Sequence, residues 1–116
     1  MRRVRTLAWT ALAIGVVVVT GAMPQVAQGD DGFVLTFKDN KLDPAELQVP
    51  AGTEFKLVVK NADQTPEEFE SSDLKIEKII AGGSEAEFTI KALDAGSYEV
   101  YGEFHEDTAK GHIVAK

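Results

Sequence analysis

Short apolar runs with a period of two residues constrain the fold of this chain more than any other feature. The runs are separated by Gly, Pro, Asp and Asn, at spacings of about 8–12 residues that are typical of antiparallel sandwiches and barrels. The residues predicted to point into the core are Phe33, Leu35, Phe37, Phe55, Leu57, Val59, Leu74, Ile76, Ala86, Phe88, Ile90, Tyr98 and Val100. No segment repeats apolar residues every three or four positions, so no long helix is expected. The pattern therefore predicts one all-β domain.

The N-terminal segment has the layout of a secretory signal peptide. Three arginines, Arg2, Arg3 and Arg5, precede an apolar run over residues 7–19, and Ala22 and Ala27 are suitable last residues of a cleaved leader. A retained membrane anchor is the alternative, but the apolar run is shorter than the roughly 20 residues that a spanning helix needs. We therefore expect a signal peptide at 1–27, a folded domain at 28–116, and a periplasmic or secreted protein with no membrane insertion after leader cleavage.

Charge and cysteine content narrow the possible functions. Without the leader the chain keeps nine lysines against 19 acidic residues, a net charge of −10 at pH 7. Such a domain should repel nucleic acid and attract cations. The chain of 116 residues contains no cysteine, which excludes disulfides, a thiolate nucleophile and iron–sulfur clusters.

Two stretches resemble the cupredoxins, the small copper-binding β-sandwiches. They are "LDPAELQVPAGTEFKLVVKN" and "AGSYEVYGEFHEDTAKGHIVAK", the second of which is similar to the C-terminal signature of the family. The resemblance implies a cupredoxin-like Greek-key β-sandwich of about seven to eight short strands. It also implies that His105 matches the family's C-terminal histidine ligand. The other copper-ligand positions fall on Gly102 or Glu103, on Ala109 or Lys110, and on Glu67 or Glu68.

The replaced ligands argue against a blue-copper electron carrier, which depends on a copper–thiolate bond. The resemblance instead brings His105, Glu67, Glu103 and Glu68 to one end of the sandwich, with the two glutamates expected at a turn after Pro66. One imidazole with two or three carboxylates suits iron, manganese, zinc or Cu(II). The alternative is that these acids are only solvated surface groups. No catalytic residue is predicted, and a binding or accessory protein is favoured over an enzyme.

"TPEEFES" and "GEFHEDTAKG" together resemble a narrower branch, the cupredoxin-like proteins found with bacterial high-affinity iron permeases. This resemblance implies a role in iron uptake: binding, delivering or helping to oxidise iron, or binding Cu(II), with an iron permease as partner. Two other functions stay open. One is a metal-free protein-interaction subunit of a cell-envelope complex. The other is a Cu(I) carrier, which the scarcity of methionine disfavours.

Overall fold

The computed structural model describes residues 28–29 and 32–116, and the expected leader at 1–27 lies outside them. Ten strands and one 3-10 turn, η1, form in this part of the chain. Their bounds are β1 Gln28–Gly29, β2 Gly32–Lys38, β3 Lys41–Asp43, β4 Glu46–Val49, β5 Phe55–Asn61, β6 Glu67–Ser71, β7 Ile76–Ile80, β8 Glu85–Ile90, β9 Gly96–Gly102, η1 Glu103–His105 and β10 Lys110–Ala115.

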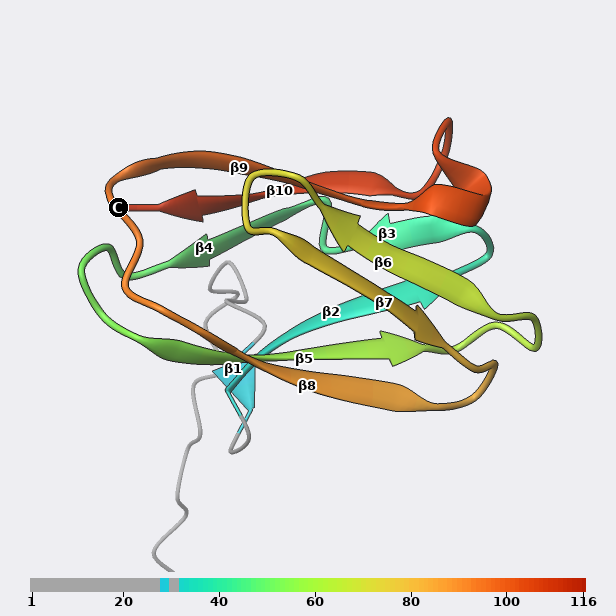
Figure 1. Ribbon diagram of the computed structural model, residues 1–116. Coiled ribbons are helices and arrows are strands. Elements are labelled where there is room, and N and C mark those ends of the chain that lie inside the picture. The colour runs from blue at the N-terminus through green and yellow to red at the C-terminus, as the bar shows by residue number, and fades with distance from the viewer. Residues whose placement is uncertain (1–27, 30–31) are drawn as a thin grey trace, which may run out of the picture.

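The strands form two sheets that face each other (Figure 1). The first sheet has the order β1-β2-β5-β8, with β3 added beside β2, and the second has the order β4-β10-β9-β6-β7. The pairs β2–β5 and β4–β10 are parallel, and the other pairs are antiparallel. The predicted all-β sandwich is confirmed. Within the described ranges, no helix is long and apolar enough to cross a membrane.

The core fills the space between the sheets, as the alternating pattern predicts. Its largest fully buried apolar side chains are Leu35, Phe37, Leu47, Leu57, Val59, Phe69, Val100 and Ile113. The rings of Phe37 and Phe69 pack edge-on across the two sheets with centroids 6.2 Å apart. This contact fixes the direction of β6, because Phe69 must point inward and its neighbours Glu68 and Glu70 must then point outward.

The strand count exceeds the predicted seven to eight, and the short strands β3 and β4 contain none of the residues that the alternating pattern assigns to the core. A tight turn at Asp39 and Asn40, both with positive φ, joins β2 to β3. The Asp63 carboxylate accepts the N–H groups of both turn residues, at 2.7 and 3.1 Å. Asp and Asn adopt positive φ more readily than most residues. The turn therefore follows from the dipeptide Asp39-Asn40, which a search for apolar alternation cannot detect.

Glu67 and Glu68 lie in a strand rather than at a turn, which corrects the expectation from the sequence. The strand β6 begins at Glu67 and pairs with β7 in a hairpin and with β9 on its other side. Asn61, fully buried, holds the start of this strand: its Nδ2 donates to the carbonyls of Thr65 (2.9 Å) and Ile80 (3.0 Å). The two glutamates therefore have fixed and opposite directions, one toward the interior and one toward the outer face.

Candidate metal centre

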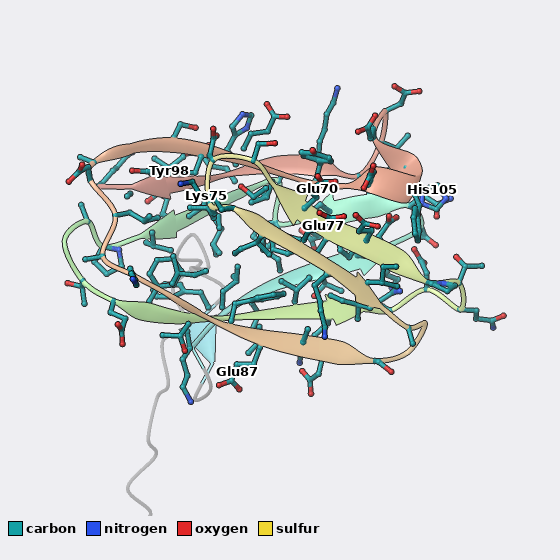
Figure 2. All side chains as sticks on the ribbon, viewed as in Figure 1. Glu70, Lys75, Glu77, Glu87, Tyr98 and His105 are labelled. Carbon is teal, nitrogen blue, oxygen red and sulfur yellow. The ribbon has the colours of Figure 1, made fainter. Side chains whose placement is uncertain are left out.

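His105 lies in a short loop at one end of the sandwich, between β9 and β10 (Figure 2). The loop is closed by two backbone hydrogen bonds, from Gly102 N to Ala109 O (2.7 Å) and from Ala109 N to His105 O (2.8 Å). Because the 3-10 turn η1 occupies its first half, His105 is directed back toward the start of β6. The loop thus holds the imidazole in place without help from a ligand.

Glu67 is the partner of this histidine and is almost completely buried, with 3% of its surface exposed. Its Oε2 lies 2.6 Å from His105 Nδ1. Its Oε1 accepts the backbone N–H groups of Phe104 at 2.9 Å and Glu68 at 3.1 Å. Both oxygens of Glu67 therefore already have hydrogen-bond donors from within the protein.

Gly102 leaves the space that the Glu67 carboxylate fills. A Cβ atom at residue 102 would lie 2.6 Å from Glu67 Cδ and 2.9 Å from its Oε1, closer than non-bonded atoms approach. Gly102 is also one of the two positions, with Glu103, at which the resemblance to cupredoxins places the copper-binding cysteine. The residues present at this end do not fit a blue-copper ion, because the thiolate is missing and a hydrogen-bonded carboxylate takes up its side-chain space.

A second group of acids lies on the outer face of the second sheet. Glu68 and Glu70 flank the buried Phe69 on β6, so both point away from the core. Phe69 pairs with Gly102 and Glu70 with Tyr101, and continuing this register by one residue puts Glu103 opposite Glu68. One carboxylate oxygen from each of Glu68, Glu70 and Glu103 lies within 4.8 Å of the other two.

The burial of Glu68 and the partial burial of Glu70 make this three-carboxylate group unlike an ordinary cluster of surface acids, although Glu103 is exposed. Glu68 is 7% exposed, although it lies on the outer face of the sheet. Its Oε1 and the Oε2 of Glu70 are both shielded from solvent and accept no hydrogen bond from the described part of the chain. Buried oxygens without a donor are destabilising, so a proton or a cation bound among these carboxylates would stabilise the folded chain.

The close approach of the three acids also shifts their pKa values. Hydrogen bonding to Glu103, together with burial, raises the pKa of Glu68 from 4.5 to about 7. Hydrogen bonding to Glu103 also raises the pKa of Glu70. The pKa of Glu103 is lowered by hydrogen bonds from Glu68 and Glu70. In the absence of a cation, a proton on Glu68 or Glu70 is thus shared with the Glu103 carboxylate.

The structure divides the four predicted ligands into two pairs. It brings Glu67 to His105 inside the loop end, and Glu68 to Glu103 on the outer face. Glu103 and His105 also line one shallow surface depression with the rest of their loop. Whether any of the four binds a metal stays a prediction.

Glu70 was missed by sequence reasoning, although a signal for it exists. The segment "EFE" at 68–70 alternates charge and aromatic side chain, which in a strand places both acids on one face. The expected turn at "PEEF" conceals this alternation, because residues in a turn have no fixed face. His112 lies exposed on β10.

Comparison with known proteins identifies the family that this fold and loop end define. The sequence pattern of the cupredoxin-like domain matches residues 11–115. The chain belongs to the cupredoxin-like domain family. A relative from Rickettsia prowazekii (strain Madrid E), Uncharacterized protein RP394, is 44% identical over 80 residues, which span 69% of this chain and 64% of that protein.

Solved structures support the same fold. Amicyanin from Paracoccus versutus superposes with a TM-score of 0.60 at 16% identity, covering 76% of this chain and 84% of amicyanin. A purple cupredoxin from Nitrosopumilus maritimus gives 0.56 at 18% identity, covering 72% of this chain and 98% of that structure. At these identities the likeness concerns the architecture and leaves the ligand set to be argued from the residues themselves.

Proposed function

We propose that this chain is an exported metal-binding protein that takes part in iron uptake, holding the ion with the carboxylates of Glu68, Glu70 and Glu103. The ion is then passed to, or received from, an iron permease in the cell envelope. The resemblance of "TPEEFES" and "GEFHEDTAKG" to permease-associated proteins supports this role. The membership of the cupredoxin-like family supports metal binding in general.

The observation that carries the proposal is the pair of buried carboxylate oxygens that have no hydrogen-bond donor. Metal–oxygen distances of about 2.0–2.6 Å put opposite ligand atoms roughly 4–5 Å apart across an ion. The three oxygens, all within 4.8 Å of one another, are therefore spaced for a common ion after small side-chain movements. A bound cation would replace the shared proton and relieve the repulsion among the acids.

The donor set favours iron over copper as the physiological ion. Carboxylate oxygens suit hard cations, whereas Cu(I) requires sulfur ligands that this site does not contain. Cu(II) binds tightly to almost any oxygen or nitrogen site, so its binding in vitro would carry little information about the site. The protein thus serves iron uptake by binding and delivering the ion rather than by blue-copper electron transfer.

Calorimetric titration of the full-length chain with Mn(II), and with Fe(II) under anaerobic conditions, tests the proposal. We expect one ion per chain, with affinity reduced about tenfold or more in Glu68→Gln and Glu103→Gln, since affinity follows the charge of the ligands. Glu85→Gln, an exposed acid on β8 of the other sheet, is the matched control and should bind as the parent does. His105→Ala should also retain binding.

The same titration can refute the proposal in two ways. Binding that is lost in His105→Ala and kept in Glu68→Gln would move the ion to the loop end beside Glu67. An absence of saturable binding to the parent chain would remove the metal site altogether.

A metal-free interaction subunit is the second candidate, and one observation favours it. Ile79 and Phe104 are large apolar side chains with 58% and 49% of their surfaces exposed. Ile79 lies opposite Glu68 in the register of β6 and β7, and Phe104 follows Glu103. A partner protein could bury both residues whether or not an ion is present.

A further inference from the structure

We propose that Glu77 of β7 is a fourth ligand of the carboxylate site, and that the four-acid site selects a trivalent oxygen-binding cation of the iron(III) class over divalent ions. This inference rests on the proposed function, because it concerns the same site. It adds a residue that neither the sequence pattern nor the three-carboxylate geometry includes. It also names the kind of ion that the site takes.

The hairpin register puts Glu77 next to the site. Glu70 and Glu77 are directly paired across β6 and β7, and Glu68 is paired with Ile79. Side chains of directly paired residues share a face, with Cβ atoms about 4.5–5.5 Å apart. Figure 2 shows Glu70 and Glu77 close together on the outer side of these strands.

Glu77 differs from Glu68 and Glu70 in exposure. It is solvent-exposed, as Glu103 is, whereas Glu68 is buried and Glu70 is half-buried. A flexible carboxylate at the rim can close over an ion after the ion has bound to the inner acids. The unpartnered Oε1 of Glu68, which is shielded from solvent, marks the inner side of the site.

No basic side chain balances these four acids in the described part of the chain. The ion pairs found there are Lys56–Glu87 and His105–Glu67, and neither includes a member of the group. Lys110 lies one strand further away, paired with Tyr101. It lines a separate depression with Glu99 and Glu106.

The charge of the site decides which cations it prefers. Four ionised carboxylates contribute four negative charges, and a divalent ion would leave half of them unbalanced at close range. Each added carboxylate attracts a trivalent ion more strongly than a divalent ion of the same size, because the Coulomb energy scales with the ion's charge. All donors are oxygen, which hard, highly charged ions prefer over nitrogen or sulfur. Among the ions relevant to iron uptake, iron(III) meets these requirements best.

The test compares two probe ions of similar radius and different charge, Tb(III) and Ca(II), on the full-length chain. Tb(III) binding is followed by its luminescence, and Ca(II) and citrate-delivered Fe(III) are followed by their displacement of Tb(III). Most carboxylate sites bind Tb(III) more tightly than Ca(II), so the decisive quantity is the change of the affinity ratio in Glu77→Gln. We expect this variant to lower the Tb(III)/Ca(II) affinity ratio about tenfold, by removing one charge near the ion, while Glu85→Gln leaves it unchanged.

Each outcome separates this inference from the proposed function. Fe(III) displacement of Tb(III) together with the lowered ratio in Glu77→Gln supports the inference. Binding of both probes with a ratio that Glu77→Gln does not alter overturns the role of Glu77 and the selection by charge, and leaves the three-carboxylate site standing. Failure of the parent chain to bind either probe overturns both.

Discussion

Glu67 should stabilise the fold without any metal, and its replacement by alanine is the sharpest test of the loop end. The substitution removes the acceptor of two backbone N–H groups and of His105 Nδ1, at 2.9, 3.1 and 2.6 Å. Hydrogen bonds to a charged group contribute about 1.5–3 kcal/mol each when measured singly, and less in sum because they share one acceptor. The His105 side chain is 32% exposed, so water replaces part of its lost interaction. We therefore expect a loss of about 3 kcal/mol.

Equilibrium unfolding in urea, with a chelator present, measures this loss directly. For a domain of this size, about 3 kcal/mol corresponds to a fall in melting temperature on the order of 10–20 °C. The matched control is Glu54→Ala, an exposed acid in the loop before β5, which should change stability by no more than about 0.5 kcal/mol. A loss below about 1 kcal/mol in Glu67→Ala, or a loss that appears only after a metal is added to the parent, would refute the reasoning.

Three further changes test other parts of the structure. In the metal-free chain, the pKa of Glu68 is raised from 4.5 to about 7. The contribution of Glu68 to stability is therefore complete below pH 4.5 and falls as the pH rises through about 7. Glu68→Gln should flatten this fall in urea titrations across that range. Gly102→Ala forces a Cβ against Glu67 and should cost about 1–3 kcal/mol; an unchanged unfolding midpoint would show that the carboxylate can move aside. Asp63→Ala frees the turn at Asp39 and should cost about 1 kcal/mol, with faster amide hydrogen exchange confined to that turn.

The sandwich could be predicted because its signal is periodic and local. Alternation in β2, β5 and β8 predicted which side chains face the core, and Leu35, Leu57 and Ile90 are buried accordingly. The short strands β3 and β4 were not predicted, because Pro44 and the two-residue turn at 39–40 interrupt the apolar alternation. The turn into β3 is held by the hydrogen bond from the Asp39 N–H to Asp63, residues 24 positions apart, and β4 pairs with the distant strand β10.

The carboxylate site could be predicted only in part, since it depends on register across three strands. The resemblance to cupredoxins pointed to Glu68 and Glu103 as neighbours. It grouped them with Glu67 and His105 because loop ligands in that family converge on one ion. The direction of each glutamate is decided by the insertion of Phe69 into the core. That insertion turns Glu67 inward and Glu68 outward. A predicted turn at these two residues gives no direction to either side chain.

The position of a bound ion tests the central claim most directly. Crystals of the full-length chain soaked in Mn(II) or Tb(III) would locate the ion by its anomalous scattering. The account predicts one peak on the outer face of the second sheet, within about 2.0–2.6 Å of carboxylate oxygens from Glu68, Glu70 and Glu103, with the Glu67–His105 hydrogen bond intact. A peak between Glu67 and His105, or ions bound only at scattered surface acids, would contradict it.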